Sequence, residues 1–141
     1  MIHLYYRQRC TSTPRAIEWF KSYGIKVCIR SSGQISREEL ITALSSTEKG
    51  FTDLLKHPNH LNDEEISKIR LLKTLTLNQA LDFIKVNPQL LRSPIIIERN
   101  KVLIGYNPDQ IRMFLPPEYR RSTLFRKERE EVLKRKDRFK K

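Results

Sequence analysis

The amino-acid pattern predicts an α/β fold with a mixed sheet core, an inserted helical lobe and a basic C-terminal tail. Apolar residues alternate at 2–6 and at 25–29, and a helix-like segment lies between them. Three segments between 36 and 86 begin with helix-capping patterns, and a β-hairpin pattern follows Pro94. These observations describe a strand-helix-strand unit, a run of helices and a hairpin.

The first unit places a cysteine next to a helix. The helix is predicted from about 14 to 23, after good capping residues, and Gly24 is a typical residue to follow its end. Cys10 lies in the loop between the strand at 2–6 and this helix, where ligands commonly approach α/β sheets. Unpaired amides at the helix start favour the thiolate form. Reactive chemistry at Cys10 is therefore physically plausible.

Helical signals continue from Ser36 to Val86, and we expect at least three helices there. Each of three residues that favour the N-cap is followed three positions later by Glu or Gln, and these pairs are Ser36 with Glu39, Asn62 with Glu65, and Thr76 with Gln79. Gly50 and Pro58 interrupt the helical pattern. We assign residues 35–75, approximately, to an inserted helical lobe.

The segment after Pro88 returns to strand patterns. Residues 94–97 are mostly β-branched, 98–101 form a polar turn and 102–104 complete a hairpin. A last helix is predicted after Asn107, ending at two prolines. This order of elements is that of a thioredoxin-type fold, in which a cis proline lies beside the cysteine loop. Pro94 is the candidate for that role.

Charge is concentrated at the C-terminal end. The 141 residues carry a net charge of +12, from 28 Lys and Arg against 16 Asp and Glu. Residues 118–141 hold 11 basic and 5 acidic residues, which gives +6, and the preceding 117 residues, at 17 against 11, supply the other +6. Because this tail has few apolar residues, we expect it to be a frayed helix or disordered in isolation.

Composition also predicts the cellular compartment. Apolar runs are too short to span a bilayer, and the N-terminus lacks the apolar region of a signal peptide. Two cysteines make only one disulfide, which favours a reducing compartment. We expect a cytoplasmic protein that does not associate with membranes.

Four sequence blocks in order resemble the Spx branch of the arsenate reductase-like (ArsC/Spx) family. They are LYYRQRCTS, TEKGFTDLL, LLRSPIII and IGYNPDQIRMFLP, and the resemblance covers about residues 1–117. It implies a thioredoxin-like core with an inserted helical lobe. Spx proteins are regulators that bind the C-terminal domain of the RNA polymerase α subunit and alter promoter choice. The arsenate reductases of the family instead use a nucleophilic cysteine with several arginines, and recycle with glutathione and glutaredoxin.

The cationic positions of this chain favour the regulator. Arsenate reduction needs a thiolate and arginines that hold the oxyanion through paired hydrogen bonds. Cys10 and Arg92 match the enzymes, but Lys56 stands at another arginine position and Ile104-Gly-Tyr106 replaces a third. Two of three cationic positions are therefore changed, and we expect no enzyme activity and no cofactor.

The chain also differs from the best-known Spx pattern. The Cys-x-x-Cys redox switch of those proteins is here Cys10-Thr-Ser-Thr13, and threonine forms no disulfide. Cys28 lies in the predicted second strand, where we expect it to pack in the core. An internal disulfide switch is therefore not expected. Modification of Cys10 by a small thiol, or an intermolecular disulfide, remains open.

Two residues are candidates for contacting the α subunit. Gly50 matches the family motif for that contact, and a residue without a side chain allows close approach to the backbone; the alternative is an ordinary helix C-cap. The Arg92 side chain has three possible partners, in order of preference: backbone carbonyls near the lobe, an anion beside Cys10, or solvent.

The three histidines, His3, His57 and His60, match no common metal-ligand spacing.

The tail supplies candidate contacts to DNA phosphates. Such contacts add affinity without reading bases and weaken with salt; the alternative is a solvated run of charge. The candidate residues are Arg120, Arg121, Arg126, Lys127, Lys134 and Arg135.

The primary hypothesis is a regulator of transcription that acts in a stress response, is monomeric when free, and docks on the α subunit through the surface around Gly50 and the first helix. The rival is a single-cysteine thiol oxidoreductase or a glutaredoxin-linked arsenate reductase. A third alternative is a family member that acts as an adaptor for another protein.

Overall fold

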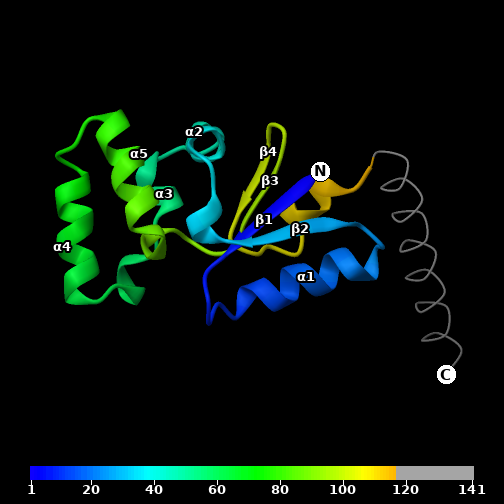
Figure 1. The fold of residues 1–141 in the computed structure, drawn as a ribbon. Coiled ribbons are helices and arrows are strands. Elements are labelled where there is room, and N and C mark those ends of the chain that lie inside the picture. Colours follow the sequence, from blue (N-terminus) through cyan, green and yellow to red (C-terminus); the bar gives the residue numbers. More distant parts are fainter. Residues whose placement is uncertain (117–141) are drawn as a thin grey trace, which may run out of the picture. The chain divides into compact units, whose positions relative to one another are not determined.

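The computed structural model describes residues 1–116 (Figure 1). The chain divides into a unit of residues Met1–Ile111 and a unit of residues Arg112–Lys141, and only 112–116 of the second are described. The tail at 118–141, with its six candidate phosphate contacts, lies outside the described residues. The elements in chain order are β1 (Ile2–Tyr6), α1 (Ser12–Ser22), β2 (Val27–Ser31), η1 (Ser32–Gln34), α2 (Arg37–Ser45), α3 (Phe51–Leu54), η2 (Pro58–His60), α4 (Asp63–Leu72), α5 (Leu77–Val86), η3 (Pro88–Leu90), β3 (Ile95–Glu98), β4 (Lys101–Ile104) and η4 (Gln110–Phe114).

A four-stranded mixed sheet forms the core, in the order β2-β1-β3-β4. Strand β1 runs parallel to β2 and antiparallel to β3, and β3 and β4 form the expected hairpin. Figure 1 shows α1 along one side of this sheet and helices α2 to α5 following β2. We call α2 to α5 (37–86) the helical lobe. The predicted thioredoxin-like fold is confirmed.

The end of α1 explains why β2 begins two residues later than predicted. Gly24 has φ of +65°, and its amide donates to the Lys21 carbonyl at 3.0 Å. The Ile25 amide donates to the Phe20 carbonyl at 2.9 Å, so the two bonds form a Schellman motif. Ile25 therefore belongs to the helix end, and β2 begins at Val27, which pairs with Ile2.

The helical lobe forms as its capping patterns predict. In each of α2, α4 and α5 the N-cap side chain accepts from the N3 amide and the N3 side chain accepts from the N-cap amide. Helix α2 ends at Ser45, however, and Gly50 is the N-cap of α3. The alternative that Gly50 is an ordinary C-cap of the preceding helix is therefore wrong.

A hydrogen bond from Tyr5 joins β1 to the lobe. Tyr5 is 1% exposed, and its hydroxyl donates to Glu39 Oε1 at 2.6 Å. The same oxygen accepts from the Ser36 amide at 3.3 Å, so the cap of α2 is also an anchor for the sheet. Burial, followed by the bond to Glu39, raises the pKa of Tyr5 far above its usual range. Leu40, Leu54, Leu81 and other buried side chains pack in the same cluster.

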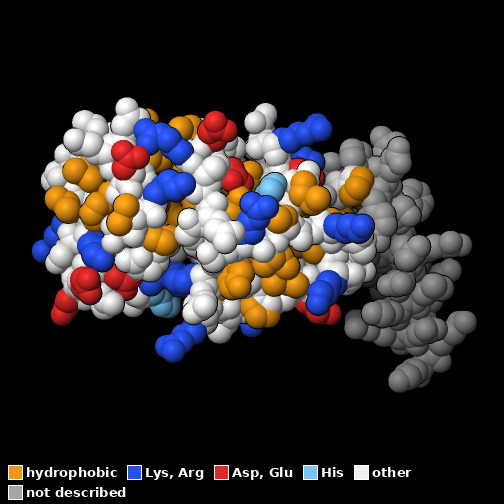
Figure 2. Space-filling view, viewed as in Figure 1, with side chains coloured by type: hydrophobic (Ala, Val, Ile, Leu, Met, Phe, Trp, Pro, Cys, Tyr) orange, Lys and Arg blue, Asp and Glu red, His pale blue; other side chains and the backbone are white. Residues whose placement is uncertain are grey.

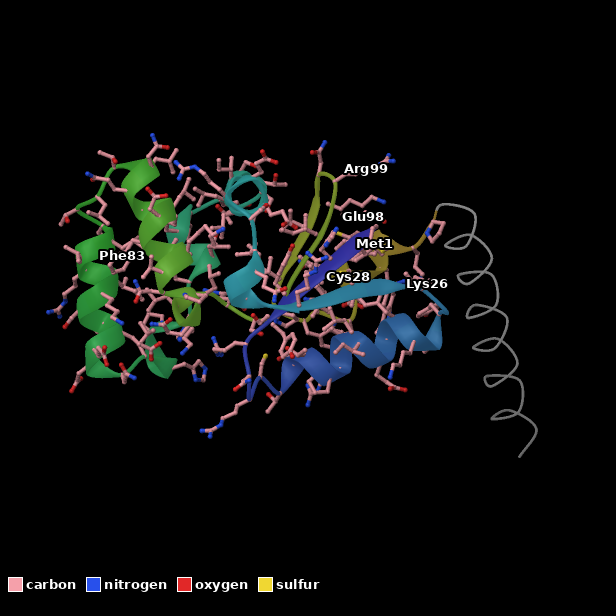
Figure 3. All side chains as sticks on the ribbon, in the orientation of Figure 1. Met1, Lys26, Cys28, Phe83, Glu98 and Arg99 are labelled. Atoms are coloured by element: carbon pink, nitrogen blue, oxygen red, sulfur yellow. The ribbon has the colours of Figure 1, made fainter. Side chains whose placement is uncertain are left out.

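The hairpin and the segment after it follow the predicted order with one change. Glu98 and Arg99 lie at the hairpin turn (Figure 3), and Arg99 has φ of +55°. Asn107 Oδ1 accepts from the amides of Asp109 and Gln110, at 2.9 and 3.0 Å, as an N-cap does. The predicted last helix is a short 3₁₀ helix, Gln110–Phe114, because Pro116 follows too closely for a longer α-helix to form.

The surface of the lobe is partly apolar. Figure 2 shows hydrophobic side chains over α4 and α5 with charged side chains around them, and Leu71, Leu77 and Val86 are each more than half exposed. None of the helices in residues 1–116 combines the length and apolar character that crossing a bilayer requires.

Candidate functional site

The cysteine loop lies against the segment that contains Pro94. Cys10 is half-buried between β1 and α1, and the Ser93–Pro94 peptide bond is cis, as the sequence suggested. The Cys10 thiol donates to the Ser93 carbonyl at 3.3 Å, and the Arg7 amide donates to Ser93 Oγ at 2.9 Å. Ser93 therefore links the two segments.

The surroundings of Cys10 favour its thiolate. Partial burial alone raises the pKa of a thiol, but hydrogen bonds from the side chains of Ser93 and Thr13 and the amides of Ser12 and Thr13 outweigh it, so that the pKa of Cys10 lies below its usual range. Thr11, the N-cap of α1, makes no side-chain capping bond. The amides at the helix start therefore remain available to the sulfur.

Alkylation of Cys10 by iodoacetamide is expected to persist to lower pH than alkylation of N-acetylcysteine, because a lowered pKa leaves more thiolate at a given pH. Mass spectrometry of the Cys10 peptide across a pH series measures this. The midpoint is the decisive quantity, since a thiolate of lower pKa is also a weaker nucleophile. A midpoint at or above that of N-acetylcysteine would contradict the assigned environment.

Cys28 is not the core residue that the sequence predicted. It lies on β2 (Figure 3), an edge strand, and is half-buried rather than buried. Both cysteines are free thiols. In the alkylation experiment Cys28→Ser removes any contribution from this second thiol.

Arg92 joins the core to the helical lobe. Its Nε donates to the Leu55 carbonyl at 2.6 Å and its Nη2 donates to the Thr52 carbonyl at 3.3 Å. The backbone assists, since the Arg92 amide donates to the Leu54 carbonyl and the Lys56 amide donates to the Leu90 carbonyl. The first of the three alternatives for Arg92, bonds to carbonyls near the lobe, is the one that the structure shows.

The Lys56 side chain is held by an acidic side chain. Its Nζ lies 2.8 Å from Glu65 Oε2, and the two side chains are 15% and 10% exposed. Burial alone raises the pKa of Glu65, but the hydrogen bond from Lys56, the Asn62 amide, and the charges of Lys56 and Arg7 outweigh it, so the pKa is lowered. The ammonium of Lys56 is thus neutralised within the protein.

Arg7 is the residue that sequence reasoning missed. Its Nη1 donates to the Leu91 carbonyl at 2.9 Å, 84 residues away, so no local pattern reveals its role. Together with Lys56 and Arg92 it forms a set of three cations whose side chains bind carbonyls or a carboxylate of this chain.

The third cationic position of the enzymes has no cation here. Gly105 has φ of +82°, and its amide donates to the Pro94 carbonyl at 2.7 Å. Ile104 ends β4, where it pairs with Ile95, so the backbone of this segment meets the strand that follows Pro94.

Gly50 precedes α3, the helix whose carbonyls Arg92 binds. Its backbone has φ of +66° and ψ of −131°, a conformation that strongly favours glycine. Apart from its two chain neighbours, no residue has an atom within 4 Å of where a Cβ would stand. A shallow hollow of about 390 Å³ lies nearby, lined by residues that include Glu48, Asp53, Arg92 and Ile104. The structure thus brings Gly50 and Arg92 to the two ends of one short helix.

In the described part of the chain the three histidines belong to no group that could hold a metal ion. Within residues 1–116, no group of three His, Cys, Asp or Glu side chains is placed to hold a metal ion. His57 Nδ1 accepts from the Asn59 amide at 3.2 Å, and its ring stands edge-on to that of His60.

Residues 5–114 match the family model described as ArsC family. The chain belongs to the ArsC family. The "Global transcriptional regulator Spx" of Streptococcus mutans is 32% identical over 127 residues, covering 88% of this chain and 90% of that protein. The "Global transcriptional regulator Spx 1" of Lactococcus lactis is 33% identical over 127 residues, covering 88% and 96%. These relatives confirm the resemblance to the Spx branch.

The family fold is also seen in a solved structure. The arsenate reductase from Vibrio cholerae superposes with a TM-score of 0.63 at 18% identity, covering 81% of this chain and 97% of that chain. At this identity the likeness shows the ArsC fold and not the activity.

Proposed function

We propose that this protein is a cytoplasmic regulator of transcription that binds the C-terminal domain of the RNA polymerase α subunit and alters promoter use in a stress response. Its curated relatives are named global transcriptional regulators. The docking surface lies around Gly50 and α1, and Arg92 holds α3 in place through the Leu55 and Thr52 carbonyls. The protein is a monomer before it binds, and residues of the tail contact DNA phosphates without reading sequence.

The main support for this proposal is that three cationic side chains already bind groups of the protein itself. An oxyanion substrate needs cationic donors that are available to it, and arginine suits this role because its donors form a fork. Here Arg7 and Arg92 donate to backbone carbonyls, and Lys56 pairs with Glu65. An arsenate ion beside Cys10 would compete with these partners for the donors that they occupy, whereas a docking protein leaves the contacts intact.

The conformation at Gly50 supports a docking role. The space around its Cα is open, so the glycine is not required by packing within the protein. Because glycine has no side chain, a partner can approach the backbone closely at this half-buried helix start.

Gly50→Arg is expected to weaken binding to the purified α C-terminal domain about 30-fold or more, because the side chain would occupy the space that the partner fills. Gly50→Ala is the matched control. It shares the backbone strain of any substitution at this φ but adds a methyl group that meets nothing within 4 Å. We expect the alanine variant to bind within a few-fold of wild type in calorimetric titrations.

Two results would count against the proposal in different ways. Equal binding by wild type and Gly50→Arg would remove Gly50 from the interface. No binding by wild type, in a preparation with a native circular dichroism spectrum, would contradict α-subunit docking itself.

A second candidate function, a single-cysteine thiol oxidoreductase, is favoured by one observation, the lowered pKa of Cys10. The test supplies glutathione and glutaredoxin and measures turnover of arsenate or of a glutathione mixed disulfide. Turnover that Cys10→Ser abolishes would favour the oxidoreductase. We expect that the wild type binds the α subunit and shows no turnover, which favours the regulator.

A further inference from the structure

The helical lobe contains a second hollow, separate from the cysteine loop. Its volume is about 350 Å³, which is at the lower end of the range for small-molecule sites. It is bounded by α3, the chain that leads to α4, the inner side of α4 and the turn after it. The lining residues are Lys49, Phe51, Thr52, Leu55, Lys56, Pro58, Leu61, Ile69, Leu72, Lys73 and Leu75.

The walls of this hollow are apolar and incompletely covered. Phe51, Leu61, Ile69 and Leu75 are each only half-buried, although they face a common space. Helix α4 has ten residues, of which only Glu65 and Leu72 are buried. An apolar ligand in the hollow would remove these half-buried side chains from water, which is favourable.

All charged residues that line the hollow are positively charged. It includes three lysines and neither Asp nor Glu. Lys56 is neutralised by Glu65, but Lys49 and Lys73 are exposed, and neither ammonium forms an ion pair within the described part of the chain. The apolar walls therefore meet solvent beside two exposed ammonium groups that form no ion pair within residues 1–116.

We propose that this hollow binds a linear alkyl carboxylate, with the alkyl chain against the apolar walls and the carboxylate at the ammonium groups of Lys49 and Lys73. A neutral apolar ligand would leave the lysines without a partner. The segment at 118–141 is the wrong occupant, because its net charge of +6 repels the two lysines. All residues that line the hollow belong to the helical lobe, so binding of the alkyl carboxylate does not depend on docking to the α subunit.

The test is calorimetric titration of the full-length protein with decanoate, below the concentration at which decanoate forms micelles. We expect saturable binding of one decanoate per chain. 1-Decanol, which lacks the charge, and butyrate, which lacks the chain, should each bind at least tenfold more weakly. Decyltrimethylammonium, with the opposite charge, should show no binding at the same concentrations.

Variants locate the site. The pair Lys49→Glu with Lys73→Glu should weaken decanoate binding at least tenfold, whereas Lys85→Glu, an exposed lysine of α5 that does not line the hollow, should leave it unchanged. Ile69→Trp fills the hollow and should abolish binding. Leu61→Trp provides a second filling variant on the loop, for use if Ile69→Trp fails to fold.

Several outcomes would overturn the proposal. They are no saturable binding of decanoate, equal affinity for decanol or decyltrimethylammonium, and undiminished binding by a folded tryptophan variant or by the double lysine variant. The last result would place decanoate on another basic surface. If an acidic amphipathic helical peptide binds the hollow and decanoate fails to displace it, the occupant is a protein segment and the proposal is also wrong.

Discussion

Glu65→Gln is expected to lower the free energy of unfolding by about 2 to 3 kcal/mol at pH 7, because it leaves the Lys56 ammonium in a largely buried position without its counter-charge. The distance of 2.8 Å and the low exposure of both side chains separate this pair from ordinary surface ion pairs. Glutamine keeps an oxygen that can accept from the Asn62 amide, so the substitution isolates the charge from the helix cap. Urea unfolding followed by circular dichroism measures the difference.

The adjacent residue provides a matched control. Glu64 forms an ion pair with Lys68 at 3.4 Å, but its side chain is 78% exposed. Glu64→Gln should change the free energy of unfolding by less than about 0.5 kcal/mol. An equal loss in both variants would show that the Lys56–Glu65 pair has no special role.

The pH dependence of the Glu65 effect follows from its lowered pKa. A carboxyl group whose pKa is lower in the folded than in the unfolded state stabilises the fold above its unfolded pKa, and this stabilisation declines as the pH falls through its folded pKa. The difference between wild type and Glu65→Gln should therefore be largest near neutral pH and shrink below the usual glutamate range. A difference that stays constant with pH would contradict an ionic origin.

Local sequence signals predicted most of the secondary structure. The three capping boxes, the Gly24 helix end and the β-branched hairpin all depend on residues within a few positions of one another. The order of these elements along the chain was then enough to predict the thioredoxin-like fold. Where the pattern was weaker, as in the last helix, the nearby proline shortened the element to a 3₁₀ helix.

The candidate site was only partly predictable, since its decisive contacts are long-range. Cys10 and Pro94 were identified because the order of elements brings their loops together. The partners of Arg7 and Arg92 are carbonyls 84 and 37 residues away, and every residue offers a carbonyl, so no side-chain pattern identifies them. The capping role of Glu65 was visible in the sequence, whereas its pairing with Lys56 depends on how the chain packs between α3 and α4.

Arg92→Met is expected to lower the free energy of unfolding by about 2 to 3 kcal/mol, because it removes the charged groups that donate to the Leu55 and Thr52 carbonyls. Methionine keeps an apolar side chain of similar length. Arg92→Lys should recover only part of this loss, since an ammonium lacks the planar fork that reaches both carbonyls. Arg15→Met, at an exposed position of α1, is the control and should have little effect.

The same variants distinguish a structural arginine from an anion ligand. A ligand that binds only the folded state raises the melting temperature by mass action. If Arg92 stays bound to the two carbonyls, arsenate should raise the melting temperature of wild type no more than sulfate does at equal ionic strength. The melting temperature of Arg92→Met should likewise change equally with the two anions. An arsenate-specific increase in wild type that disappears in Arg92→Met, with Arg15→Met behaving as wild type, would show that the guanidinium leaves its carbonyls for the anion and would favour the arsenate reductase.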